Sequence, residues 1–138
     1  MKHHASGPFE VSLKPLDPYN KDEGAGLGRM SIDKQFHGAL EAVSKGEMLT
    51  AGSPVKGSAG YVAIERVSGT LDGRKGSFVL QHNATMDRGT PTLNISVVPD
   101  SGTGELSGLR GQMNIIIAEG KHSYSFDYTL PESPAEKP

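Results

Sequence analysis

The chain has no cysteine and no tryptophan among its 138 residues. Without cysteine there can be no disulfides, no thiolate zinc sites and no cysteine nucleophiles, and this lack is typical of a reducing cytoplasm. The start of the chain, Met1-Lys2-His3-His4-Ala5, also lacks the apolar segment of a secretory signal. We therefore expect a cytoplasmic protein.

Charge of one sign is not concentrated anywhere in the chain. The 14 basic and 16 acidic residues give a net charge of −2, and no run of lysine and arginine occurs. The electrostatic basis for binding nucleic acid is thus missing. The longest apolar run, residues 115–118, is too short to span a bilayer. We expect a single domain with no nucleic-acid partner and no membrane partner.

Helical periodicity is missing as well. The one stretch that could suggest a helix, residues 39–48, contains Gly46. Apolar residues instead alternate with polar ones, as they do in strands with one buried face. The segments with this alternation are 9–13, 30–36, 93–97, 113–117 and 124–130.

Three turns indicate how the strands pair. Asp72-Gly73 is a strong hairpin signal, and its loop could be Asp72-Gly73, Gly73-Arg74 or all four residues 72–75. In each case the apolar faces of segments 60–71 and 76–86 coincide. Turns at residues 87–90 and 119–120 place apolar side chains of their flanking strands on a common face in the same way.

Consecutive hairpins of long, one-sided strands, with no helix to cover them, tend to close into a barrel. We therefore predict an all-β fold, an antiparallel meander β-barrel of about eight to nine strands. The domain is expected to span residues 1–130. Residues 131–138 contain three prolines and no large apolar residue, so they are expected to form a loose tail.

A glutamate and a histidine share the apolar face of the central hairpin. In every even-length turn, Glu65 lies opposite or diagonal to His82, within side-chain reach. Such a pair could act as a base and its orienting group, or polarise a bound oxygenated ligand. Alternatively, it is a structural ion pair that fixes the strand register.

Four further residues are in phase with apolar neighbours. Lys34 could join Glu65 inside the barrel and bind an anionic or carbonyl group, or it could extend its ammonium to a barrel end. Tyr61, Tyr124 and Tyr128 should line the same interior. The hydroxyl groups of these tyrosines could bind a polar ligand atom. Alternatively, the tyrosines are core residues whose hydroxyl groups are hydrogen-bonded within the protein. The ligand-binding candidates are therefore Glu65, His82, Lys34, Tyr61 and Tyr124.

No recognised cofactor or metal motif is present. The five histidines do not combine with acidic residues at a known metal-binding spacing. The glycine-rich segments 102–104 and 108–111 do not match a phosphate loop. No serine lies in a nucleophile elbow. We expect no cofactor and no metal.

Apolar residues also occur on the face of the strands that should point outward. They are Val62, Ile64, Val79 and Ile116. Apolar groups on an outer surface often mark a subunit interface, so we expect a homo-oligomer.

Several segments together carry a family resemblance. They are Phe9-Glu10-Val11, residues 28–36, 57–63, 65–66, 69–73, 76–82 and 101–106, and His122-Ser123-Tyr124 through Tyr128. Over roughly residues 5–130 the chain resembles a bacterial family of small proteins of unknown function. The resemblance implies a barrel similar to that of plant allene oxide cyclase. It implies no activity, because a shared barrel does not mean a shared reaction.

Three functions fit these observations. The first is binding of a small hydrophobic or oxygenated molecule in a barrel cavity. The second is an isomerase or cyclase acting on such a molecule through shape and fixed electrostatics. The third is a packed structural or oligomer-forming barrel without a ligand. The sequence leaves open whether the protein is an enzyme. A filled barrel would exclude both small-molecule functions.

Overall fold

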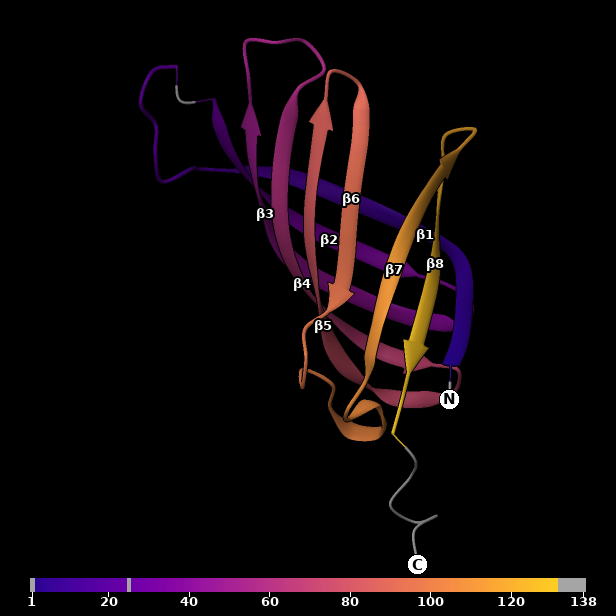
Figure 1. The fold of residues 1–138 in the computed structure, drawn as a ribbon. Coiled ribbons are helices and arrows are strands. Elements are labelled where there is room, and N and C mark those ends of the chain that lie inside the picture. The colour runs from indigo at the N-terminus through magenta and orange to yellow at the C-terminus, as the bar shows by residue number, and fades with distance from the viewer. Residues whose placement is uncertain (1, 25, 132–138) are drawn as a thin grey trace, which may run out of the picture.

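The structure is a computed structural model that describes residues 2–24 and 26–131. Eight antiparallel strands form a closed barrel, in which each strand pairs with the next and β8 pairs with β1 (Figure 1). The strands are β1 (Lys2–Leu16), β2 (Leu27–Phe36), β3 (Leu40–Gly52), β4 (Ala59–Leu71), β5 (Arg74–Asp87), β6 (Thr90–Val97), β7 (Arg110–Ala118) and β8 (Lys121–Thr129). A short 3-10 helix, η1 (Gly104–Leu106), precedes β7.

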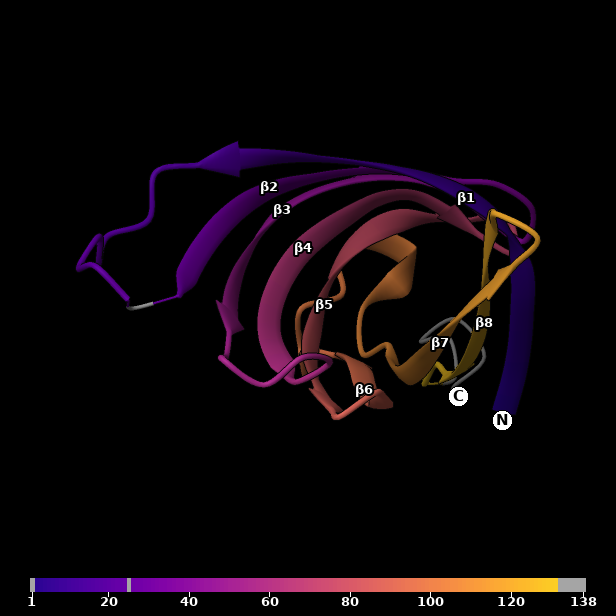
Figure 2. The ribbon, with the colours of Figure 1, turned by 90° about the horizontal axis from the view of Figure 1, so that it is seen from above.

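The predicted all-β meander barrel is confirmed, with eight strands. The segment that could have suggested a helix lies almost entirely within β3. Figure 2 shows the long strands β1 to β5 bending around a common interior. Of the expected tail, residues 132–138 lie outside the described residues. No helix among the described residues is long and apolar enough to cross a membrane.

The turn between β4 and β5 decides how their side chains meet. Leu71 pairs with Arg74, so the loop is Asp72-Gly73. Both loop residues have positive φ, 49° and 81°, as a type I′ turn requires. In this register Glu65 is paired with Leu80 and Ala63 with His82. Glu65 and His82 are therefore diagonal neighbours on the inner face.

The other two turns also bring the apolar faces of their strands together, as predicted. His82 is opposite Ile95 across β5 and β6, and Ile117 is opposite His122 across β7 and β8. Apolar side chains thus meet on one inner face all the way from β4 to β6 and from β7 to β8.

One end of the barrel is filled by its own side chains. The residues there are almost completely buried; they include Phe36, Leu40, Leu71, Phe78, Leu80, Phe126 and Tyr128. The connection from β6 to β7 packs against this core through Leu106 and Leu109, which are both buried. The interior at this end is therefore occupied by side chains.

The other end is open, because β6 and β7 separate there. These strands are paired at Ile95–Met113 and Ser96–Gln112, near one end of each strand. Beyond these pairs the two strands diverge (Figure 1). A cavity of about 720 Å³ occupies this half of the barrel.

The outer surface carries the apolar residues that the alternation predicted. Val62, Ile64 and Ile116 are about half exposed, while Val79 is half-buried. The homo-oligomer remains a prediction, which sedimentation at micromolar concentration would test.

Two strands approach each other unusually closely beside Glu65. Gly46 in β3 is its pairing partner, and a Cβ at Gly46 would lie 2.1 Å from the carbonyl oxygen of Ile64 and 2.6 Å from the Cα of Glu65. We expect Gly46→Ala to lower the free energy of unfolding by about 1–3 kcal/mol, because backbone would have to move. Urea denaturation measures this change. Lys45→Ala, on the exposed outer face, is the control; equal stability of the two variants would contradict the close approach.

Candidate functional site

A fully buried carboxylate organises the site. Glu65 has no exposed surface, and both of its oxygens are occupied. The Ser44 hydroxyl donates to Oε1 at 2.6 Å. The Lys34 ammonium and His82 Nε2 both meet Oε2, at 2.7 Å and 2.5 Å. Four strands, β2, β3, β4 and β5, thus contribute one residue each to this cluster.

The charge state of Glu65 follows from its neighbours. Burial raises the pKa of its carboxyl, but the hydrogen bond from His82 and the charge of Lys34 outweigh burial and lower the pKa to about 2. Glu65 is therefore an ionised carboxylate, which can accept hydrogen bonds but not donate them. It follows that His82 carries a proton on Nε2 and donates it to Glu65.

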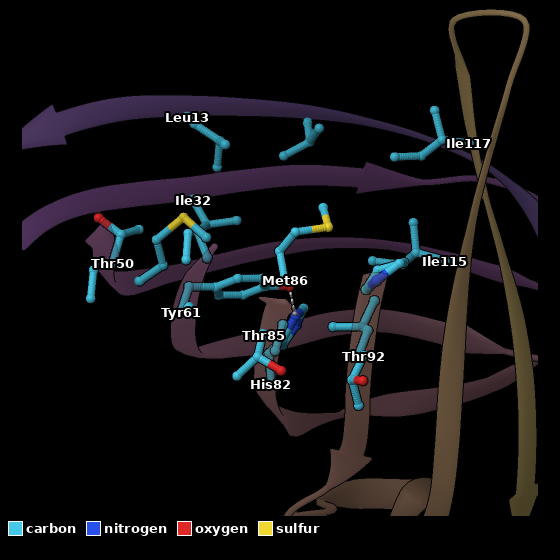
Figure 3. A pocket seen from close by; sticks show the side chains of 18 of the residues that line it. Leu13, Ile32, Thr50, Tyr61, His82, Thr85, Met86, Thr92, Ile115 and Ile117 are labelled. Atoms are coloured by element: carbon cyan, nitrogen blue, oxygen red, sulfur yellow. Dashed lines mark hydrogen bonds between the residues drawn. The ribbon is translucent and has the colours of Figure 1, made fainter. Parts of the chain in front are cut away.

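The second ring nitrogen of His82 faces Tyr61. The Tyr61 hydroxyl lies 3.3 Å from Nδ1, as the dashed line in Figure 3 shows. When His82 is neutral with its proton on Nε2, Nδ1 has a free lone pair, so the Tyr61 hydroxyl donates to it. Burial, followed by the nearby charge of Glu65, raises the pKa of Tyr61 and keeps its hydroxyl protonated. The three residues form one hydrogen-bonded chain, Tyr61–His82–Glu65.

Lys34 is a buried cation. Its side chain is 6% exposed, and its ammonium lies 5.3 Å and 5.7 Å from the ring centres of Phe9 and Phe36. These rings and Glu65 compensate the charge. The ammonium does not extend to the barrel end, the alternative that the sequence left open.

Lys34, Tyr61 and His82 all line the cavity, while Glu65 lies behind them. The rest of the lining is mainly apolar and comes from all eight strands; it includes Val11, Leu13, Ile32, Met48, Ala84, Met86, Leu93 and Ile115. Figure 3 shows Tyr61 and His82 on one side of this space and Ile115 and Ile117 on the other. The cavity is thus an apolar space with a small polar region. Glu65 contacts two of its lining residues, Lys34 and His82.

The structure does not bring Tyr124 to this group. Tyr124 is buried, but its hydroxyl donates to the carbonyl oxygen of His37 at 2.7 Å and accepts from the backbone amide of Leu40 at 2.9 Å. Tyr128 likewise points its hydroxyl at the carboxylate of Asp72. Neither residue lines the cavity. The hydroxyl groups of both tyrosines thus have hydrogen-bond partners within the filled core.

Two residues at the site were not among the candidates. Ser44 completes the hydrogen bonds of Glu65, and His122 lines the cavity and packs against Phe9 with ring centres 5.4 Å apart. His122 was recognisable from its pairing with the inward Ile117. Ser44 was not, because the connection between β3 and β4 has no short turn that would fix their register.

The chemistry open to this cluster is acid–base and electrostatic. Among the described residues, no group of three or more histidine or acidic side chains is placed to hold a metal ion. An imidazole that is hydrogen-bonded to a carboxylate on one side and to a phenol on the other, as His82 is, can hold or pass a proton. A buried ammonium beside it can hold an oxygen atom of a ligand.

These features define a small meander barrel, filled at one end, with an apolar cavity at the other and a buried Lys–Glu–His cluster between them. The family model described as "Protein of unknown function (DUF3224)" matches residues 5–128. The chain therefore belongs to this family.

A solved structure agrees with this membership. It is a protein with unknown function from the DUF3224 family of Shewanella oneidensis MR-1, a bacterium. The two chains are 51% identical, with a TM-score of 0.91, over 96% of this chain and 100% of that one. The search of curated proteins found no match. The predicted family resemblance and barrel are thus confirmed.

Proposed function

We propose that the protein binds a small, mainly apolar molecule with an oxygen-containing group in the open half of its barrel. The observation that supports this best is the cavity itself, an apolar space of about 720 Å³ that is lined by Lys34 and His82, which contact Glu65, and by Tyr61, which contacts His82. Ligand sites are commonly apolar cavities of this size with a few fixed polar groups.

A packed barrel without a ligand fits less well. Such a barrel would fill its interior with its own side chains, as this one does around Phe78 and Phe126. In the other half, small residues such as Ala84 and Gly60 line an open space instead. A buried charged cluster beside an unfilled cavity suits ligand binding better than packing.

A single substitution inside the cavity tests ligand binding. Ala84 is a half-buried lining residue, so we expect Ala84→Phe to fill the space and abolish retention of any ligand that co-purifies from the native host. Native mass spectrometry of the purified protein measures the retained mass. Asn83→Phe is the matched control, because Asn83 is the next residue and points outward.

Loss of the retained mass in Ala84→Phe but not in Asn83→Phe would support the proposal. A wild-type protein from its own host that carries no small molecule under gentle conditions would contradict it.

An isomerase or cyclase acting on the same molecule is the second candidate. The hydrogen-bonded chain Tyr61–His82–Glu65 favours it, because such a chain can move a proton without a metal ligand or a nucleophile. The recovered molecule would be incubated with fresh protein and followed by NMR, since an isomer keeps its mass. Rearrangement that is lost in His82→Gln would support catalysis. An unchanged molecule would show that the protein binds it without converting it.

A further inference from the structure

The buried end of the cavity offers hydrogen-bond donors. Lys34 lines the cavity and is only 8% exposed. Its ammonium can donate three hydrogen bonds, and among the described residues its one hydrogen-bond partner is Glu65. Donors therefore remain for an acceptor oxygen of a ligand, whatever the charge of His82.

From this end, three strands run to the barrel mouth, and the inward side chains of each change from buried to exposed. His82 on β5 pairs with Ile95 on β6, which pairs with Met113 on β7, and all three are buried. Four residues from these, towards the open end, three exposed apolar residues line the cavity: Met86, Pro91 and Ile117. Figure 3 shows Met86 and Ile117 towards the same end, away from His82. The cavity thus has a polar, buried end and an apolar, exposed mouth.

The mouth continues into the gap between β6 and β7. Beyond Ile95 and Met113 these strands are not paired, and they diverge (Figure 1). Leu93 and Ile115 line the cavity from the two sides of this gap, and Ile117, two residues beyond Ile115, is 66% exposed. A molecule that begins at the buried end can therefore extend into the gap and still contact apolar side chains.

Resting on the proposed function, we propose that the ligand is a slender, elongated molecule bound head first. An acceptor oxygen at one end of it is held by the Lys34 ammonium, and its apolar chain runs to the mouth, where it covers Met86 and Ile117. Ile117 is then a specificity-determining residue that selects chain length.

The distribution of polar and apolar surface carries this orientation. A chain that covers Met86 and Ile117 removes exposed apolar surface from water, which favours binding. In the reverse orientation the chain would desolvate the Lys34 ammonium without offering it a hydrogen bond, which is costly. The length is set by the strands, since four residues of a strand span about 13 Å.

Two methyl ketones, 2-heptanone and 2-undecanone, are suitable probes. Their carbonyl oxygen accepts hydrogen bonds but neither donates nor titrates, so the result does not depend on the charge of a histidine. An extended 2-undecanone is long enough to reach the mouth from Lys34, whereas 2-heptanone is four carbons shorter. Calorimetry should show tighter binding of 2-undecanone to the wild-type protein, by about fourfold for each further methylene that becomes buried.

A pair of neighbouring variants locates the chain end. Ile117→Gln should weaken 2-undecanone about threefold or more and leave 2-heptanone unchanged, because the short chain ends before the mouth. Ile116→Gln is the matched control: Ile116 is also about half exposed, but it lies on the outer face and does not line the cavity. Equal effects of Ile117→Gln on both ketones, or no difference from Ile116→Gln, would overturn the proposal.

The orientation is measured on the wild-type protein by NMR. The two methyl groups of 2-undecanone, one beside the carbonyl and one at the chain end, have separate signals. The first should give nuclear Overhauser effects to Val11, which pairs with Lys34 and lines the cavity. The second should give them to Met86 and Ile117. The reversed pattern would show that the oxygen faces the mouth and would overturn the proposal.

Two further outcomes separate this proposal from the proposed function. If neither ketone binds but the wild-type protein retains another molecule from its host, cavity binding stands and the elongated, head-first class is overturned. If neither ketone binds and no molecule co-purifies, both proposals fail. The affinity and NMR measurements on the wild-type protein need no variant, so poor folding of a variant cannot hide the answer.

Discussion

Replacing Glu65 by glutamine is expected to destabilise the barrel by about 3–5 kcal/mol, the cost of removing one partner from a buried ion pair. The carboxylate holds Lys34, His82 and Ser44 in place from a position without solvent contact. A glutamine of the same shape would leave the Lys34 ammonium buried without its counter-charge. Its neutral amide oxygen would also accept more weakly from Lys34 and His82 than the carboxylate does. Urea denaturation measures the change in the free energy of unfolding.

Glu47→Gln is the matched control for this experiment. Glu47 also forms an ion pair, with Arg29 at 2.6 Å, but both side chains are substantially exposed. Exposed pairs contribute about 0–1 kcal/mol, so this variant should be close to wild type. If Glu65→Gln were as stable as Glu47→Gln, the buried cluster would not be a structural element, and Glu65 would serve the cavity alone.

Acid should remove the same stabilisation without any mutation. The pKa of Glu65 is lowered from 4.5 to about 2 in the folded protein. A carboxyl with a lowered folded-state pKa contributes stability that is fully present above its unfolded-state pKa and is lost as pH falls through the folded value. The pKa difference corresponds to about 3 kcal/mol, present above about pH 4.5 and lost towards about pH 2.

The comparison of wild type with Glu65→Gln isolates this effect, because other carboxyl groups titrate equally in both proteins. Their difference in free energy of unfolding should be largest at about pH 5 and shrink steadily towards about pH 2. Urea titrations at several pH values measure it. A difference that stayed constant over this range would show that Glu65 keeps its ordinary pKa in the barrel.

Both predictions concern a positioning role. Glu65 does not line the cavity, whereas Lys34 and His82 do. A buried anion in this position orients two groups that can act on a ligand and fixes which nitrogen of His82 carries its proton. The structural ion pair and the functional pair, which the sequence analysis treated as alternatives, can therefore be one arrangement.

The parts of the fold that depend on short turns can be predicted from the amino-acid sequence. Asp72-Gly73 allows a tight turn with positive φ at both residues, and every even-length loop around it puts Glu65 and His82 on one face. Side chains in strands alternate with a period of two, so parity alone sufficed to predict this contact. The turns after β5 and β7 fixed their pairs by the same logic.

Which residues join that pair, and what lies beside it, depends on how the whole barrel closes. Lys34 and Ser44 come from β2 and β3, and the connections from β1 to β2 and from β3 to β4 are too long to impose a register. The cavity exists because β6 and β7 separate beyond two paired positions while the connection between them packs Leu106 and Leu109 into the other end.

Tyr124 and Tyr128 share the inward phase of the strand pattern but lie in the filled end. Alternation tells which face a side chain takes; its height along the barrel depends on how all eight strands are staggered on closure, and no local pattern encodes that.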